Sequence, residues 1–162
     1  MGFSVEIITP LIRFLENTTM KKFILFILFL IAMLPARSAY LLVPMDETQS
    51  NHLKAYGMAY WILEQEVEVD WLLNYKGGSF MCKYHDLIEQ ECVIRGVSYQ
   101  IIADAQSSAI LLEISDPQAN MDAVKLHKPP KIAVYSPKNK QPWDDAVTLV
   151  LTYAEIPYDV VY

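Results

Sequence analysis

The chain has 162 residues, of which 53% are hydrophobic and 20% are charged, and its net charge is −6. This size allows a domain with a real buried core. The acidic balance and the lack of a basic tract in the sequence argue against nucleic acid as a partner, because nucleic acids and anionic membrane surfaces are bound by clustered Lys and Arg.

The first predicted element is an export signal. Met20-Lys21-Lys22 precedes the uncharged run FILFILFLIAML, which is followed by PARSAY. A basic start, a short apolar run and small residues after a proline are typical of a secretory signal peptide. The alternative is an uncleaved membrane anchor, which needs about 20 apolar residues to cross the bilayer. We therefore predict a signal peptide over 20–39 and an exported chain, periplasmic or secreted, with no stable membrane span after cleavage.

Residues 1–19 stand in front of this complete signal peptide. We interpret them as a mis-called upstream extension and Met20 as the true start. Cleavage after Ser38 would leave Ala36 and Ser38 at the positions where small residues are expected. Cleavage after residue 39 would remove four basic and two acidic residues, so the net charge of −6 would become −8.

Strands and helices alternate in the first predicted domain, residues 40–115. Apolar or alternating runs bounded by turn residues predict strands, and apolar residues spaced by three and four predict helices. Gly96 suits a helix end and Asp104 a helix cap. The expected elements are strands over 40–45, 67–75 and 97–102, helices over 52–65, 85–95 and 105–115, a loop over 46–51 and a turn over 76–79.

The remaining residues are predicted to form a linker and a further βαβ unit. The composition of residues 116–130, which end in two prolines, is typical of a linker. The expected elements after it are a strand over 131–137, a loop, a helix over 143–155 and a strand over 158–162. The alternation of strands and helices along the whole chain predicts an α/β fold made of βαβ units, with a mainly parallel sheet.

Two stretches of the sequence share one order of features. Each has an apolar strand, a proline, a polar loop, a helix and then a Glu followed four residues later by an Asp, namely Glu66 with Asp70 and Glu155 with Asp159. The shared order indicates a repeat, although any two βαβ units look alike. A parallel sheet needs both of its faces covered. We therefore expect residues 131–162 to be the truncated start of a second domain.

Two groups of residues are candidates for ligand binding. Asp46 and Glu47 follow the first predicted strand, where ligands bind in open α/β sheets. Gly77, Gly78 and Ser79 follow the second, and their backbone N–H groups could hold an anion. The alternatives are helix N-terminal carboxylates favoured by the helix dipole and a tight turn.

The histidines and cysteines do not form a recognisable catalytic or metal-binding pattern. His52, His85 and His127 are not at metal-ligand spacing, so neither a metal nor a cofactor is expected. Cys82 and Cys92 could form one disulfide in an exported chain or remain two buried thiols. Cys82 has no histidine at a diagnostic spacing, so we assign no catalytic residue.

Several stretches resemble known families. Residues 131–162 resemble the opening of a class I glutamine-amidotransferase-like, flavodoxin-like domain. AYLLVPMDETQSNHLKAYGMAYW, WLLNYKGGSF and IRGVSY resemble the N-terminal region of exported bacterial proteins often labelled asparagine synthetase B. The resemblance implies a longer exported parent, an amidotransferase or a hydrolase acting on an amide, whose catalytic positions would fall beyond Tyr162. The alternative is a non-enzymatic α/β module that binds a small molecule or a protein partner.

Overall fold

The computed structural model describes residues 22, 26, 39–136, 139 and 146–162. The chain divides after Arg37 into two compact units, and the second one, Ser38–Tyr162, contains every described strand. The predicted upstream extension and almost all of the predicted signal peptide lie outside the described residues, so both stay predictions. Within the described part of the chain, no helix is both long enough and apolar enough to cross a membrane.

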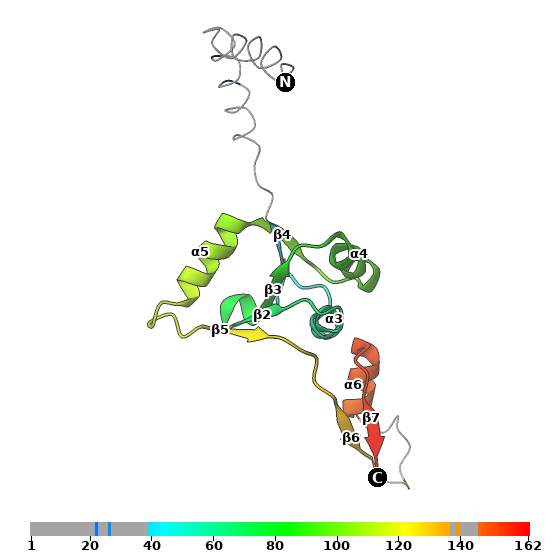
Figure 1. Cartoon of the computed structure of the whole chain (residues 1–162). Coiled ribbons are helices and arrows are strands. Elements are labelled where there is room, and N and C mark those ends of the chain that lie inside the picture. The colour runs from blue at the N-terminus through cyan, green and yellow to red at the C-terminus, as the bar shows by residue number, and fades with distance from the viewer. Residues whose placement is uncertain (1–21, 23–25, 27–38, 137–138, 140–145) are drawn as a thin grey trace, which may run out of the picture. The chain divides into compact units, whose positions relative to one another are not determined.

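The second unit contains both strands and helices, and in two places one strand follows another without an α-helix between them, as Figure 1 shows. Most of the predicted elements lie close to observed ones. The Asn51 side chain caps the first of these helices by accepting a hydrogen bond of 3.1 Å from the Lys54 N–H. Gly96 ends the next helix in the left-handed conformation, as its position predicted. The elements are β1 (Ala39–Val43), α3 (His52–Glu64), β2 (Val69–Leu73), the 3₁₀ turn η1 (Tyr75–Gly77), β3 (Ser79–Lys83), α4 (Asp86–Arg95), β4 (Gln100–Ala103), α5 (Asp104–Ile114), β5 (Asp122–Leu126), β6 (Ala133–Tyr135), α6 (Ala146–Ala154) and β7 (Asp159–Val161).

Five of the strands form one sheet in the order β4-β1-β3-β2-β5. Each neighbouring pair in this sheet is antiparallel. Strands β1 and β2 run in the same direction, but β3 lies between them, so the first βαβ unit is split. From β1 to β4 the element order βαββαβ and the strand order are those of the ferredoxin-like arrangement. Strand β5 adds a fifth strand beside β2.

The expectation of a mainly parallel sheet with a flavodoxin-like second domain is therefore wrong. Two strands that the sequence did not predict change the topology. Strand β3 follows directly on the turn after β2 and returns antiparallel, which places it between β1 and β2. Strand β5 lies inside the predicted linker, 116–130, and pairs with β2. Among the described strands, only β6 and β7 are parallel neighbours.

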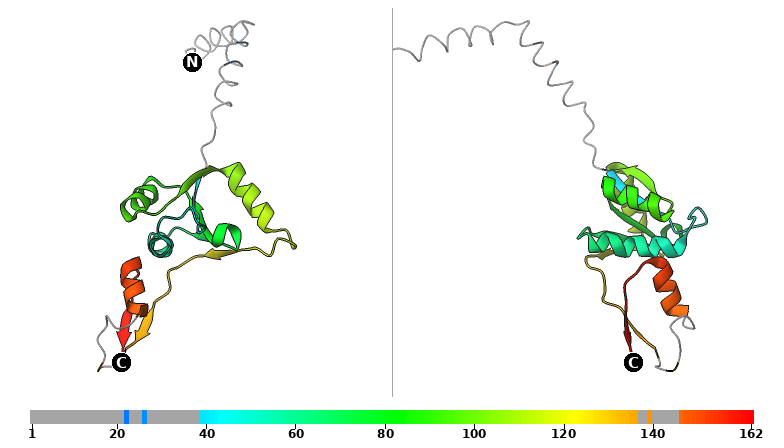
Figure 2. Two further views of the ribbon diagram at one scale, coloured as in Figure 1. Left: turned by 180° about the vertical axis from the view of Figure 1, so that it is seen from behind. Right: turned by 90° about the vertical axis from the view of Figure 1, so that its right-hand side faces the viewer.

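Helices cover both faces of the five-stranded sheet (Figures 1 and 2). Helices α3 and α4 lie on one face and α5 on the other. Each face has its own apolar core, so four of the five residues of β3 and the last three residues of β1 are buried. The core under α3 and α4 is Leu41, Val43, Met45, Ala55, Met58, Ala59, Ile62, Leu63, Val69, Phe80, Cys82, Ile88, Cys92 and Val97, and the core under α5 is Leu42, Leu72, Met81, Ile102 and Ile114.

The C-terminal βαβ unit packs on this domain through α6 and α3. Gly57 allows the close approach, because a Cβ atom at this position would lie 1.7 Å from the carbonyl oxygen of Ala154. At the N-terminal end of α3, the Asn51 amide donates a hydrogen bond of 2.6 Å to the Tyr153 hydroxyl. The Glu155 carboxylate forms ion pairs with Lys54 and, at 3.1 Å, with Arg95 of α4. The two helices thus cross at a glycine, and hydrogen bonds and ion pairs lie around the crossing.

Candidate functional site

The structure brings together the two loops that hold the predicted ligand-binding residues. The loop after β1 carries Asp46 and Glu47, and the loop between β2 and β3 carries the two glycines. The Met45 N–H donates a hydrogen bond of 3.0 Å to the carbonyl oxygen of Lys76. A Cβ atom at Gly77 would lie 2.3 Å from the carbonyl oxygen of Met45, so only glycine fits there.

Asp46 is engaged within its own loop. Its carboxylate accepts hydrogen bonds from the Thr48 N–H at 3.0 Å and from the Thr48 hydroxyl at 2.5 Å. These two hydrogen bonds lower the pKa of the Asp46 carboxyl below its ordinary value. His52 Nε2 lies 3.1 Å from the carbonyl oxygens of Met45 and Asp46. Asp46 and His52 therefore shape the loop, while Glu47 is exposed to solvent.

The Gly77–Gly78 segment is a strained turn. Its left-handed residues include Asn74 with φ of 62° and Lys76 with φ of 42°, besides the two glycines at 79° and 96°. A non-glycine residue in this region costs conformational energy, so the surrounding contacts must hold the turn in place.

Those contacts include a buried hydroxyl and an indole. The Ser79 hydroxyl lies within hydrogen-bonding distance of the carbonyl oxygens of Tyr75 at 3.0 Å and Lys76 at 3.2 Å. Trp71 Nε1 donates a hydrogen bond of 3.2 Å to the carbonyl oxygen of Gly78. The arrangement favours the tight-turn interpretation of these residues, and anion binding by them stays a prediction.

The two cysteines lie in the core between the sheet and α4. Both are free thiols in the structure, Cys82 on β3 and Cys92 on α4, and both belong to one apolar cluster. Burial raises the pKa of each thiol to about 12, so neither is a thiolate at neutral pH. A disulfide between them stays a prediction, which a count of free thiols in denatured, unreduced protein would check.

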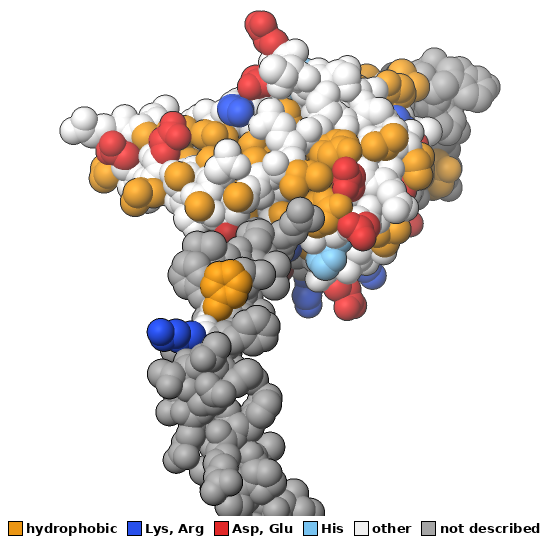
Figure 3. All heavy atoms as spheres, turned by 90° about the horizontal axis from the view of Figure 1, so that it is seen from above, with side chains coloured by type: hydrophobic (Ala, Val, Ile, Leu, Met, Phe, Trp, Pro, Cys, Tyr) orange, Lys and Arg blue, Asp and Glu red, His pale blue; other side chains and the backbone are white. Residues whose placement is uncertain are grey.

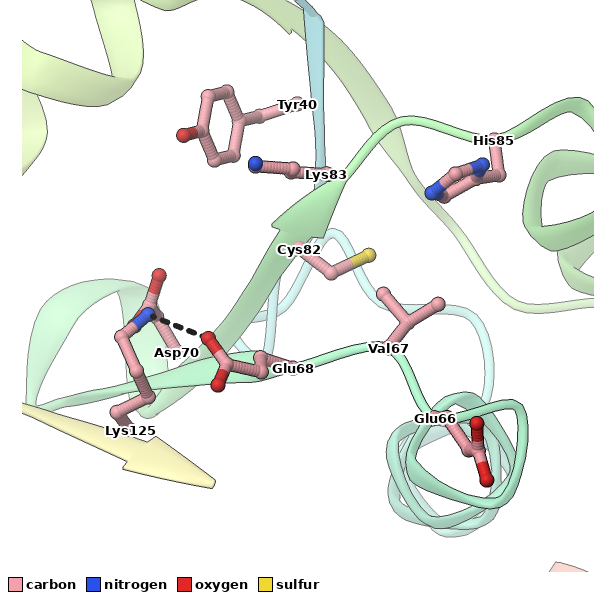
Figure 4. A pocket seen from close by; sticks show the side chains of 9 residues that line it. All are labelled: Tyr40, Glu66, Val67, Glu68, Asp70, Cys82, Lys83, His85 and Lys125. Carbon is pink, nitrogen blue, oxygen red and sulfur yellow. Dashed lines mark hydrogen bonds and ion pairs between the residues drawn. The ribbon is translucent and has the colours of Figure 1, made fainter. Parts of the chain in front are cut away.

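A charged hollow of about 260 Å³ lies at one end of the sheet (Figure 4). Lys125 Nζ lies 2.7 Å from the Asp70 carboxylate and 3.8 Å from the Glu68 carboxylate. The hydrogen bond to Asp70 raises the pKa of Lys125. Figure 4 shows His85 on the opposite side of the hollow from this ion pair. The lining residues are Tyr40, Glu66, Val67, Glu68, Asp70, Cys82, Lys83, His85 and Lys125.

The chemistry of this charged hollow is limited by its internal pairing. Asp70 and Glu68 share Lys125, and Glu68 also contacts His127 at 2.8 Å. In the described part of the chain, no group of three or more His, Cys, Asp or Glu residues is placed to hold a metal ion. The charged hollow is therefore a solvated cluster of salt bridges that holds β5 against β2.

A second hollow, which we term the aromatic pocket, has a volume of about 320 Å³ and is almost entirely apolar. Phe80 of β3 lies opposite Trp71 of β2, with ring centres 6.1 Å apart and planes inclined by 24°. The ring of Tyr56, on α3, meets Phe80 edge-on with centres 5.6 Å apart. The lining residues are Tyr56, Ala59, Tyr60, Leu63, Trp71, Phe80, Leu126, Lys128, Pro130, Ile132 and Ile156.

The sequence did not predict the aromatic pocket. Its residues come from α3, from three strands, from the segment before β6 and from the loop between α6 and β7. Trp71 and Phe80 become neighbours only through the antiparallel pairing of β2 with β3, a strand that the sequence did not predict. The available signal was the pair of aromatic residues on either side of the glycine turn.

The surface charges do not gather by sign on the face that Figure 3 shows. Acidic, basic and apolar side chains alternate there among the coloured residues. The expectation that nucleic acid is not a partner stays a prediction.

Comparison with known proteins gives no relative for this chain. No family model, curated protein or solved structure matches it. The resemblance to the proteins labelled asparagine synthetase B and to amidotransferase-like domains stays a prediction.

Proposed function

We propose that this chain is a non-enzymatic binding module that takes a small ligand with an apolar ring body in the aromatic pocket. The observation that carries the proposal is the pocket itself, about 320 Å³ of apolar space beside the rings of Tyr56, Trp71 and Phe80. Ligand sites in proteins are concave, mostly apolar and about 300–1,000 Å³ in volume. The volume lies at the small end of this range and suits a small aromatic ligand.

The position of the aromatic pocket supports the proposal. One wall is the sheet face with α3, and the other includes Ile132, just before β6, and Ile156, between α6 and β7. Aromatic rings add attraction for a flat ligand beyond the area that it buries.

Among the described residues, neither cysteine is a candidate nucleophile for an amidotransferase or hydrolase, whose catalytic positions are expected beyond Tyr162. Such an enzyme needs an activated nucleophile. Burial raises the pKa of Cys82 and Cys92 to about 12 and keeps both thiols protonated.

Export also stays part of the proposal. N-terminal sequencing of the exported protein should find Ala39 or Tyr40 as the first residue. A mature protein that begins at Met1 would refute the signal peptide.

The binding proposal can be tested with N-phenyl-1-naphthylamine, a neutral probe of a naphthalene and a phenyl ring that fluoresces in apolar surroundings. We expect saturable binding of one probe per chain. Replacing Leu126, which lines the pocket from β5, by Trp should fill the pocket and abolish this binding. Ile156→Trp fills it from the other wall and provides a second variant in case the first one does not fold.

The matched control is Leu149→Ser on α6. Leu149 is an exposed apolar residue that does not line the pocket, so this variant should bind the probe as the unaltered chain does. Circular dichroism shows whether each variant is folded. Equal probe binding by a folded Leu126→Trp or Ile156→Trp variant would contradict the proposal.

A second candidate function is the binding of a polypeptide, and a different observation favours it. The C-terminal βαβ unit exposes many large apolar side chains, which marks an interaction surface. The mature chain, 40–162, is then expected to associate as its concentration rises, and Leu149→Ser combined with Val150→Ser should reduce this association in sedimentation measurements. A monodisperse monomer would count against it. These exposed residues are Tyr135, Val147, Leu149, Val150, Tyr153, Val161 and Tyr162.

A further inference from the structure

Among the described residues, the lining of the aromatic pocket includes one charged residue, Lys128. Two other polar groups of the lining are already engaged. The Tyr60 hydroxyl donates a hydrogen bond of 3.0 Å to the carbonyl oxygen of Pro130. Trp71 Nε1 donates to the carbonyl oxygen of Gly78. The ammonium of Lys128 is therefore the group that gives the pocket its electrostatic character.

The surroundings of Lys128 differ from those of its neighbours in the sequence. Lys125 and His127 both contact acidic side chains of β2 or its preceding residues. Lys128 is exposed, and no acidic group of the described residues lies within 4.0 Å of its ammonium. Its charge is therefore available at the rim of an apolar pocket.

Acidic residues near Lys128 limit how strong this charge is. Glu64, Glu66 and Glu68 line the neighbouring hollow together with Lys128. They reduce the positive potential at the rim without pairing directly with the ammonium. A ligand anion gains from Lys128 only by approaching it more closely than these carboxylates do.

From this geometry we infer that the ligand of the aromatic pocket carries an anionic group next to its ring body. The ring body lies against Trp71 and Phe80, and a carboxylate or sulfonate meets the Lys128 ammonium at the rim. This inference rests on the proposed function, because it names the ligand class of the same pocket. The contribution of the charge is modest, since an exposed ion pair changes affinity by about fivefold at most.

Two probes with the same ring system test the inference. 1-Anilinonaphthalene-8-sulfonate is N-phenyl-1-naphthylamine with one added sulfonate. We expect Lys128→Gln to weaken binding of the sulfonate probe about two- to fivefold and to leave binding of the neutral probe unchanged. Added salt should reduce the difference between the unaltered chain and this variant, because salt screens exposed charges.

Lys131→Gln is the matched control, since it removes the same charge from the same segment at an exposed residue outside the pocket lining. It should leave the affinities for both probes unchanged. The inference is overturned if Lys128→Gln affects both probes equally or neither of them. The proposed function has its own test: it is contradicted if a folded Leu126→Trp or Ile156→Trp variant still binds the neutral probe.

Discussion

The β1–α3–β2 unit and the β6–α6–β7 unit have the same local structure. After both helices a glutamate takes the left-handed conformation, Glu66 with φ of 60° and Glu155 with φ of 59°. The N–H of each glutamate donates to the carbonyl three residues earlier at 3.1 Å, and the next N–H donates to the carbonyl five residues earlier. The repeat that the sequence indicated therefore corresponds to one shared way of ending a helix.

The two units differ in what lies between their strands. Strands β6 and β7 pair directly, whereas β3 separates β1 from β2. Helices consequently cover both faces of the sheet around β1 and β2, whereas the second unit exposes Tyr135, Leu149 and Val161. The comparison teaches that a strand–helix–strand pattern determines how the chain connects, while the next hairpin decides which strands become neighbours.

The largest expected effect comes from disturbing β3. Met81 is fully buried and packs with Leu42 and Leu72 under α5. Met81→Ala should lower the free energy of unfolding by about 2–5 kcal/mol, because a buried cavity is added to the loss of apolar burial. Chemical denaturation followed by circular dichroism measures the change.

The matched variant for this experiment is Val134→Ala in β6. Val134 is the buried residue of the directly paired strand, and the smaller truncation in a more exposed unit should cost less. An equal loss of stability in the two variants would mean that the two units contribute equally to the cooperative core.

A smaller effect is expected at the contact between α3 and α6. A methyl group at Gly57 would collide with the Ala154 carbonyl, so Gly57→Ala should separate α6 from α3. Alanine also favours the helix itself by about 1 kcal/mol, so the five-stranded domain should remain folded. Amide hydrogen exchange should speed up over α6 and stay slow in β1, whereas unchanged exchange in α6 would exclude the close contact.

The smallest expected effect concerns the pH dependence of the same contact. Hydrogen bonding to Lys54, with a further contribution from Arg95, lowers the pKa of Glu155 from its ordinary value of 4.5. A lowered pKa in the folded state stabilises the protein above pH 4.5, and this stabilisation is lost as the pH falls through the folded pKa.

Glu155→Gln removes this titration. At neutral pH the variant should be less stable than the unaltered chain by under about 1 kcal/mol, because the carboxylate is half-exposed. Thermal unfolding should show the difference shrinking toward pH 3. A difference that is independent of pH would mean that the ion pairs of Glu155 do not stabilise the docked α6.

The sequence predicted most of the elements but not the sheet. Periodic helices with caps such as Asn51 and stops such as Gly96 are local features, so they could be predicted locally. Strand β3 lacks the alternation of a one-sided strand because both of its faces are covered, and its central residues Phe80, Met81 and Cys82 are all buried. Strand β5 shows the opposite problem, since its residues are largely exposed at the sheet edge.

The site residues show the same difference between local features and long-range contacts. The sequence placed Asp46 and Gly77 in loops after strands, and the structure places these two loops against each other. It missed the aromatic pocket, because the closeness of Trp71, Phe80 and Ile156 depends on long-range pairing and on the packing of α6. Local patterns carry no information about such contacts.

The two walls of the aromatic pocket have a thermodynamic consequence. Ile132 and Ile156 belong to the C-terminal segments, whereas Trp71 and Phe80 belong to the five-stranded sheet. A molecule that touches both walls is bound only while α6 rests on α3. Ligand binding and the docking of α6 on α3 are therefore linked equilibria. Raising the ligand concentration should raise the melting temperature of the C-terminal unit toward that of the five-stranded sheet.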